Sequence, residues 1–427
     1  MNDRPVYIID GSRTPFLKAR GVGPFTPVDL AVQCGRPLLL RQPFAPDAFD
    51  QVILGCVNVI ADEMNPARVA ALRLGMGEAM PAFTVQINCG SGMQSIDTAY
   101  RYIQDGTSDL ILAGGTEALS YAPLVFRRSA VEWYMTLFAA RNIWSRLKAF
   151  ASVRPSFFSP IIGLERGLTD PIVELNMGQT AEVVAHLFNV TRRQADEYAA
   201  ESQQRLARAQ TEKVFAGEME PAFGRDGQLY DFDDGVRPDS TADSLAKLKP
   251  VFERPWGQVT AGNSSQITDG ASWVILASED AVKKHGLTPR AVIVDSEWSA
   301  LDPSIMGLGP VLCSTAIMRR HNLGLNDIDL WELNEAFAAQ VLACLAAWND
   351  DKFCREVLHL DQAAGVIDRA KLNIDGGAIG LGHPVGASGN RIVLHLVNAM
   401  KRLGHKRGIA TECIGGGQGG AMLIETV

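Results

Sequence analysis

Long hydrophobic runs are missing from this 427-residue sequence, in which none reaches the ~18 apolar residues that a membrane-spanning helix needs. A polar start leads directly into a short apolar segment that does not have the form of a secretory signal. The seven cysteines are odd in number and include no CxxC pair, so neither a disulfide framework nor a zinc site is expected. These absences predict a cytoplasmic protein with no metal.

Positive charge is also scarce, because 40 Lys and Arg stand against 48 Asp and Glu, for a net charge of −8. A general nucleic-acid binder needs a broad basic face, so we expect no nucleic-acid partner. Ordinary apolar content, 47%, and the lack of long low-complexity tracts exclude intrinsic disorder. The length predicts about two to four structural units, each with its own core.

Short apolar β-rich segments alternate with helical patterns along most of the chain, which predicts an α/β fold with a buried, mostly parallel sheet. A strand runs into Cys89 and its glycines, and another runs into Cys413 and its glycines, which suggests a duplicated fold. Residues 408–413 and 421–424 are typical of a closing hairpin. The other predicted strands cover residues 6–10, 51–54, 83–87, 109–113, 271–277, 291–295 and 330–333.

Glycine is what the sequence has in excess, with 40 residues, about 9% against a typical ~7%. Many of these glycines gather near Cys89, His383 and Cys413. Such clusters allow tight turns and a close approach of the backbone to a ligand. A phosphate-binding loop is less favoured, because no Gly-Lys-Ser/Thr follows and no GxGxxG directly succeeds a strand.

Cys89 lies where a predicted strand meets a predicted helix, in INCGSGM (residues 87–93). Gly90 and Gly92 would permit a sharp turn that presents the sulfur at the helix N-terminus, where the helix dipole favours the thiolate. Backbone N–H groups at that helix start could bind a developing oxyanion. The alternative is a small buried cysteine at a turn.

Three further residues are candidates for the same site, and each also has a structural alternative. His383 occupies GGAIGLGHPVGASG (residues 376–389), which could hold an imidazole at a ligand or be a mobile loop with an incidental histidine. Cys413 precedes a glycine-rich loop and could exchange protons near neutral pH, or be a core cysteine at a strand end. Asn334 in NEAFA could cap the next helix or hold a catalytic water.

The four blocks INCGSGM, NEAFA, GGAIGLGHPVGASG and CIGGGQGG are similar to the signature blocks of the thiolase family. VTAGNSSQITDGAS (residues 259–272) resembles the coenzyme A loop of that family, and residues 10–15 resemble its N-terminal strand exit. The resemblance implies a five-layered αβαβα core made of two duplicated halves, with an inserted loop domain. We expect an N-terminal half at 1–121, the loop domain at 122–266, a return to the first half at 267–289 and a C-terminal half at 290–427.

The resemblance also implies roles for particular residues. Cys89 would be the nucleophile that forms the acyl-enzyme, His383 its base, and Cys413 the acid/base that serves acetyl-CoA and incoming CoA. Asn334 would position a water in a first oxyanion hole, and the N–H groups of Cys89 and Gly415 would form a second. Coenzyme A and acyl-CoA would be substrates, with no metal and no redox cofactor.

Coenzyme A contacts are expected mainly from the loop domain. Ser265 matches the residue that bonds pantetheine, and Arg237 and Ser244 match positions near the adenosine and its phosphates. A solvated surface remains the alternative for Arg237, as a plain core position does for Met177. The residues that match the walls of the pantetheine tunnel are Met177, Phe252, Ala261 and Phe337.

The segment 121–175 is longer than in short-chain biosynthetic members, and Asn176 replaces their usual histidine. Within it, residues 125–158 carry six Arg and Lys and one acid, and apolar residues recur at helical spacing. Such a helix can contact an anionic membrane peripherally or dock a partner, but it could equally pack on its own core or on a dimer mate. The insertion resembles thiolase subunits of fatty-acid oxidation complexes, which implies a hydratase/dehydrogenase partner subunit and a homodimer or tetramer.

These features predict a degradative 3-ketoacyl-CoA thiolase acting on medium- or long-chain substrates. The alternatives are a biosynthetic acetoacetyl-CoA thiolase and, from another class, a non-catalytic lipid carrier or scaffold. A ketoacyl synthase is less favoured, because its active site resembles Cys-His-His, whereas here Asn334 and Cys413 accompany His383.

Overall fold

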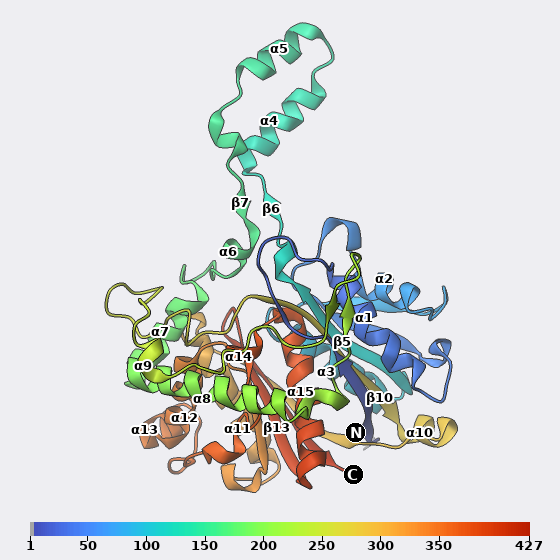
Figure 1. Ribbon diagram of the computed structural model, residues 1–427, viewed down its shortest axis with the longest axis vertical. Helices are drawn as coiled ribbons and strands as arrows, with labels where there is room; N and C mark the ends of the chain where they lie inside the picture. Colours follow the sequence, from blue (N-terminus) through green and yellow to red (C-terminus); the bar gives the residue numbers. More distant parts are fainter. Residues whose placement is uncertain (1–3) are drawn as a thin grey trace.

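The computed structural model describes residues 4–427, and its centre is one ten-stranded sheet that contains two groups of strands (Figure 1). The groups join where residues of β1 and β11 pair over only three positions. The first group is β1 (Val6–Arg13), β10 (Thr268–Ser278), β5 (Leu110–Ala118), β3 (Gln51–Gly55) and β4 (Ala82–Val85), with β2 (Leu17–Lys18) beside β10. The second is β11 (Ala291–Ala300), β14 (Gln418–Thr426), β13 (Arg407–Ile414) and β12 (Leu330–Leu333).

The expectation of a mostly parallel sheet was wrong. Only the β3–β4, β3–β5 and β12–β13 pairs are parallel. The sequential strands β13 and β14 form the predicted hairpin, and β10 enters antiparallel to both β1 and β5. Helices cover both faces of the central strands β5 and β10, which are buried along their whole length, so their pattern does not disclose their direction.

Five layers are present, as the predicted αβαβα architecture requires. Helices α1 (Pro27–Leu40) and α2 (Pro66–Arg73) pack on the outer side of the first group of strands. Helices α3 (Ser91–Gln104) and α15 (Val385–Leu403) lie against each other in the middle layer. Helix α11 (Gly309–Arg320) covers the second group and contacts α12 (Ala338–Asn349).

Local sequence signals explain several helix positions. Asn65 caps α2 by accepting the N–H of Arg68, and a proline fills the first position of the helix. The apolar stripe of α3 is buried against the sheet and α15, because its members repeat at helical spacing. The stripe consists of Met93, Ile96, Tyr100 and Ile103.

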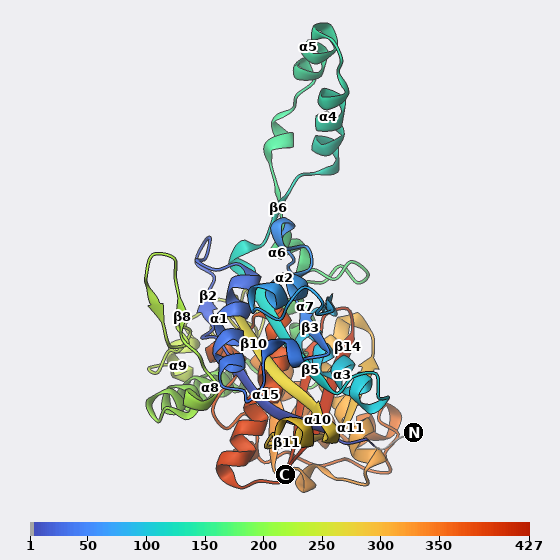
Figure 2. The ribbon, with the colours of Figure 1, turned by 90° about the vertical axis from the view of Figure 1, so that its right-hand side faces the viewer.

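The middle of the chain leaves the sheet after β5 and returns in β10. It holds α7 (Met177–Leu187), α8 (Arg192–Thr211), α9 (Ala242–Leu245) and the short pair β8 (Ala222–Phe223) and β9 (Leu229–Tyr230). A helical hairpin of α4 (Arg128–Ala139) and α5 (Ile143–Ala151) projects from the body on the strand pair β6 (Leu124–Val125) and β7 (Ile161–Ile162) (Figures 1 and 2). The remaining helices are α6 (Gly163–Gly167), α10 (Glu279–His285), α13 (Asp351–Glu356) and α14 (Ala378–Leu381).

Between residues 4 and 427, every helix is too short or too polar to cross a membrane.

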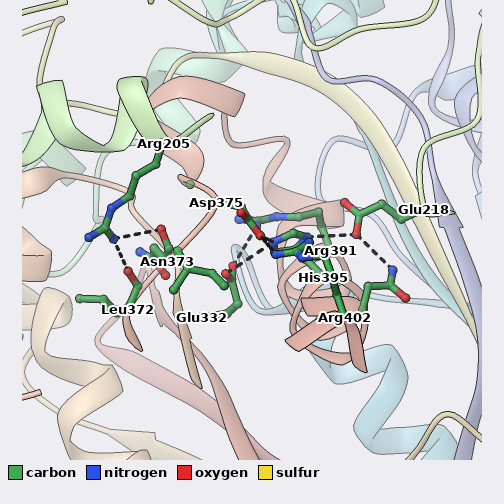
Figure 3. A network of polar contacts seen from close by, with 12 residues as sticks. Arg205, Glu218, Glu332, Leu372, Asn373, Asp375, Arg391, His395 and Arg402 are labelled. Atoms are coloured by element: carbon green, nitrogen blue, oxygen red, sulfur yellow. Dashed lines mark hydrogen bonds and ion pairs between the residues drawn. The ribbon is translucent and has the colours of Figure 1, made fainter. Parts of the chain in front are cut away.

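A buried ionic network fastens the middle region to the C-terminal half (Figure 3). His395 of α15 contacts Glu218 through Nδ1 at 3.0 Å and Asp375 through Nε2 at 3.3 Å. Arg391, one turn earlier, pairs with Glu332 of β12 at 3.0 Å. Burial lowers the pKa of His395, but the charges and hydrogen bonds of its carboxylate neighbours outweigh it and raise that pKa to about 10.

Candidate active site

The turn that carries Cys89 connects β4 to α3. Its left-handed residue is Asn88, with φ of 47°, whereas Gly90 has an ordinary helical φ of −78°. The two glycines are therefore needed for close packing rather than for the turn itself, which corrects the predicted reason. A Cβ on Gly90 would lie 2.5 Å from Cδ1 of Ile414, and one on Gly92 would lie 2.7 Å from a backbone nitrogen of α15.

The sulfur of Cys89 is partly buried, and the backbone N–H groups of Gly415 and of Cys89 itself favour its thiolate. Burial outweighs this effect and raises the pKa of the Cys89 thiol to about 12. The carboxyl of Glu412 adds little charge there, because burial without a hydrogen-bond partner among residues 4–427 raises its own pKa well above its usual range. Burial therefore outweighs the backbone N–H groups that favour the thiolate, and Cys89 is a thiol in the resting protein.

The β13–β14 hairpin brings Gly415 to this turn. Gly416 and Gly417 take left-handed φ values of 93° and 78°, so the hairpin doubles back within three glycines. The side-chain amide of Asn88 donates to the carbonyl oxygen of Gly415 at 2.8 Å. This bond ties the Cys89 turn to the hairpin that carries Gly415.

Cys413, two residues before Gly415, is 1% exposed. Burial first and the neighbouring Cys89 next raise the pKa of the Cys413 thiol well above its usual range. The two sulfurs thus lie close enough to interact, although they come from opposite halves of the chain. The expectation that Cys413 titrates near neutral pH does not hold for the resting protein, in which both cysteines are thiols.

His383 sits between α14 and α15, directly after Gly382, whose φ is 100°. Its Nδ1 lies 2.6 Å from the hydroxyl oxygen of Ser388, and that hydroxyl donates to the carbonyl of Pro384 at 3.2 Å. Since the single hydroxyl proton is used, Nδ1–H donates to Ser388 and the lone pair is left on Nε2. Burial lowers the pKa of His383 to about 4, so the imidazole is neutral.

The glycine-rich loop around His383 is a rigid buried element rather than a mobile loop. A carboxylate oxygen of Glu117 accepts the N–H of Gly386 at 3.0 Å. The carboxylate of Glu335 accepts the N–H of Ile379 at 3.3 Å and hydroxyl protons from α8. Two buried acids therefore hold the loop on both sides of the imidazole.

Asn334 follows the end of β12 and is fully buried. It does not cap α12, whose N-cap is Phe337, so the capping alternative is excluded. Its Nδ2 lies 3.5 Å from Nε2 of His383. Its Oδ1 has no hydrogen-bond partner in the described part of the chain, so it can accept a hydrogen bond from a bound water or substrate.

The segment predicted to bind coenzyme A, residues 259–272, contacts the loops that carry Asn334 and His383. The N–H of Ser265 donates to the carbonyl of Ala336 at 2.9 Å, and the N–H of His383 donates to the carbonyl of Gln266 at 3.0 Å. Ser264 also bridges to Phe337. The structure thus brings Ser265 beside both the Asn334 and His383 blocks.

Apolar side chains line the approach to the sulfurs. Sδ of Met177, the first residue of α7, would lie 3.1 Å from a Cβ on Gly415. Phe252 meets Phe337 edge-on, with ring centroids 6.3 Å apart. Ala261 is exposed in the loop that leads to Ser265. Asn176, which replaces the histidine of short-chain members, caps α7.

Arg237 and Ser244 lie farther out. Arg237 is exposed and lies close to Lys18. Burial first and then the positive charge of Arg237 lower the pKa of Lys18. Such a gathering of cations suits a phosphate. The hydroxyl of Ser244 already donates to the carbonyl of Thr241 in the cap of α9, so its contact with coenzyme A stays a prediction.

Sequence reasoning missed several supporting residues, namely Asn88, Glu117, Glu335 and Ser388. Three of them lie inside the quoted blocks, where Asn is a non-glycine residue that tolerates a left-handed φ and Ser lies five residues past the histidine. No pattern in the sequence around Glu117 marks it, because it contacts the His383 loop only in the folded chain.

Comparisons with known proteins agree with this fold. Residues 6–280 match the family described as "Thiolase, N-terminal domain", and residues 287–426 match "Thiolase, C-terminal domain". The fold and these matches define an acyltransferase. The chain belongs to the thiolase family.

Two relatives show how broad that similarity is. The chain is 39% identical to a mitochondrial 3-ketoacyl-CoA thiolase of Bos taurus, over 99% of this chain and 98% of the relative. It is 40% identical to a beta-ketoadipyl-CoA thiolase of Pseudomonas aeruginosa, over 99% and 100%. The crystal structure of human mitochondrial 3-ketoacyl-CoA thiolase in complex with CoA matches at a TM-score of 0.84 and 38% identity, over 99% and 98%.

Proposed function

We propose that this protein cleaves 3-ketoacyl-CoA with coenzyme A, giving acetyl-CoA and an acyl-CoA two carbons shorter. The observation that carries the proposal is the pair of neighbouring thiols, Cys89 and Cys413, beside a neutral His383 and the N–H of Gly415. One thiol can accept the acyl group, and the other can exchange a proton with C2 of acetyl-CoA. The relatives named 3-ketoacyl-CoA thiolase support this choice.

In the first half-reaction, Nε2 of His383 takes the proton of Cys89 as sulfur bonds to the C3 carbonyl of the substrate. The C2–C3 bond then breaks, and its electron pair forms the enolate of acetyl-CoA. The N–H groups of Cys89 and Gly415 would stabilise the negative charge that develops on the C3 oxygen when sulfur adds to the carbonyl. Cys413 gives its proton to C2, which releases acetyl-CoA and leaves an acyl group on Cys89.

In the second half-reaction, the Cys413 thiolate removes the proton of the incoming coenzyme A thiol. The coenzyme A sulfur attacks the acyl carbonyl, the bond to Cys89 breaks, and the imidazolium of His383 returns a proton to the departing sulfur. The starting protonation states are restored. High thiol pKa values suit this cycle, because each cysteine is uncharged until a substrate needs its proton.

The acyl group is proposed to be a medium or long fatty chain. Support comes from the apolar side chains at the site, Met177, Phe252 and Phe337, which would receive a hydrocarbon without unpaired polar groups. A 3-ketoadipyl group, which ends in a carboxylate, is the second candidate, favoured by the equally similar beta-ketoadipyl-CoA thiolase.

Thiolysis rates distinguish these substrates. We expect kcat/KM to rise from about four toward about sixteen carbons of 3-ketoacyl-CoA, by tenfold or more, since each methylene buried in an apolar pocket adds selectivity. A preference for 3-ketoadipyl-CoA over every fatty substrate would contradict the fatty-chain assignment. A preference for acetoacetyl-CoA, or for condensation of acetyl-CoA, would favour the biosynthetic alternative.

The Cys89→Ala variant separates an enzyme from a lipid carrier. It should lose thiolysis entirely while keeping the fold and coenzyme A binding, measured by circular dichroism and calorimetry. Turnover retained by this variant would refute the nucleophile, and lipid binding without turnover in the unaltered protein would favour the carrier.

A further inference from the structure

The projecting hairpin of α4 and α5 has a small core of its own. Trp133 and Ala130 pack with Phe157, and the indole N–H of Trp133 donates to the carbonyl of Ala149 at 2.8 Å. The cap of α5 is closed by reciprocal bonds between Asn142 and Ser145. These contacts keep the hairpin folded at a distance from the body, as both views show (Figures 1 and 2).

This core leaves the predicted apolar stripe of α4 uncovered. Met135 and Phe138 are 64% and 78% exposed, and Val131 lies on the same face. Helix α5 carries a second uncovered set, in which Trp144 is 78% exposed. The apolar side chains exposed along the hairpin are Val131, Met135, Phe138, Ile143, Trp144, Leu147, Phe150 and Val153.

The same hairpin concentrates positive charge in a chain whose net charge is −8. Its one acid, Glu132, is paired with Arg128 at 2.9 Å. The other five cations form no ion pair with any residue in the range 4–427. They are Arg127, Arg141, Arg146, Lys148 and Arg154.

We propose that the hairpin docks on an anionic lipid bilayer, with its apolar side chains in the boundary between headgroups and acyl chains. Lipid phosphates would pair with the unmatched cations, and the arginine stems would lie along the apolar layer. A second copy of the hairpin fits less well, because two surfaces of the same positive charge would meet. The stalk formed by β6 and β7 would hold the acidic body away from the negatively charged membrane.

Co-sedimentation of the full-length protein with vesicles tests this proposal. We expect binding to vesicles of equal parts phosphatidylglycerol and phosphatidylcholine, and little to phosphatidylcholine alone. The triple variant Arg141→Gln, Arg146→Gln, Lys148→Gln should lower the affinity by at least about tenfold, since each cation near an anionic surface contributes. The pair Phe138→Ser and Trp144→Ser should weaken binding independently of salt.

A matched control neutralises three exposed cations elsewhere, Arg193→Gln, Arg225→Gln and Lys283→Gln. It should bind vesicles as the unaltered protein does, and all variants should keep thiolysis activity in solution. Equal binding to both vesicle types, no binding to either, or unchanged binding by the triple variant would overturn the proposal. Hairpin variants that change the oligomeric state by light scattering without affecting vesicle binding would also overturn it and identify an interface between copies.

Discussion

The imidazole of His383 offers its lone pair at Nε2 because Ser388 holds Nδ1. Ser388→Ala removes that hydrogen bond, so the ring loses its fixed tautomer and orientation. We expect kcat to fall by roughly 10- to 100-fold with little change in KM, as orienting partners of a catalytic group commonly show. Ser314→Ala, which removes a buried hydroxyl that bonds to nothing within residues 4–427, is the matched control and should leave kcat unchanged. Equal losses in both variants would show a structural effect only.

At this scale the sequence blocks predicted which side chains meet, but not their protonation. Cys89, Asn334, His383 and Cys413 come together, although they lie hundreds of residues apart. The thiol pKa values could not be predicted, because burial depends on strands and loops that are distant in sequence. The alternative that Asn334 caps a helix was wrong for a similar reason. Its side-chain amide lies beside His383, a contact that depends on residues distant in sequence.

At the scale of elements, the contact between α3 and α15 aligns the Cys89 turn with the histidine loop. Gly92→Ala would place a Cβ 2.7 Å from the backbone nitrogen of Asn390, which cannot move aside without displacing α15. We expect a loss of roughly 1–3 kcal/mol in the free energy of unfolding, measured with urea. Gly167→Ala, at a helical glycine with open space around it, should be neutral or slightly stabilising. A neutral Gly92→Ala would contradict this packing.

The elements themselves were largely predictable, and the sheet direction was not. Apolar runs located the starts of β3, β5, β11 and β12 within one residue, but β5 and β11 each extend five residues past the predicted end. Long-range pairing decides direction, and β10 returns to the sheet only after the whole middle region, so no local pattern records which way it runs.

At the scale of the whole molecule, the charged network around His395 joins the middle region to the C-terminal half (Figure 3). Because the folded pKa of about 10 exceeds the ordinary 6.5, the stabilising charge is fully present below about pH 6.5 and is lost as pH rises through 10. We expect the free energy of unfolding to fall across that window. The His395→Asn variant should have a smaller free energy of unfolding at neutral pH. Its free energy of unfolding should also lack this fall with rising pH. An unchanged slope would exclude His395 as its source.

Assembly is the second prediction at this scale. The edge strand β4 pairs with β3 on one side only, and all four of its residues are partly exposed. We expect a homodimer in which β4 pairs with its counterpart, measured by light scattering. Gln86→Pro, directly after β4, should weaken the dimer by removing a backbone donor, whereas Gln86→Ala should not. A monomer at every concentration would contradict this assembly.

The central claim is that Cys89 carries the acyl group between the two half-reactions. Mass spectrometry of the intact protein and of its proteolytic peptides, after mixing with a long-chain 3-ketoacyl-CoA in the absence of free coenzyme A, tests it most directly. The account predicts one added acyl group, two carbons shorter than the substrate, on the peptide that contains Cys89, and its removal when coenzyme A is added. An acyl group on another residue, or cleavage with no covalent adduct, would contradict the account.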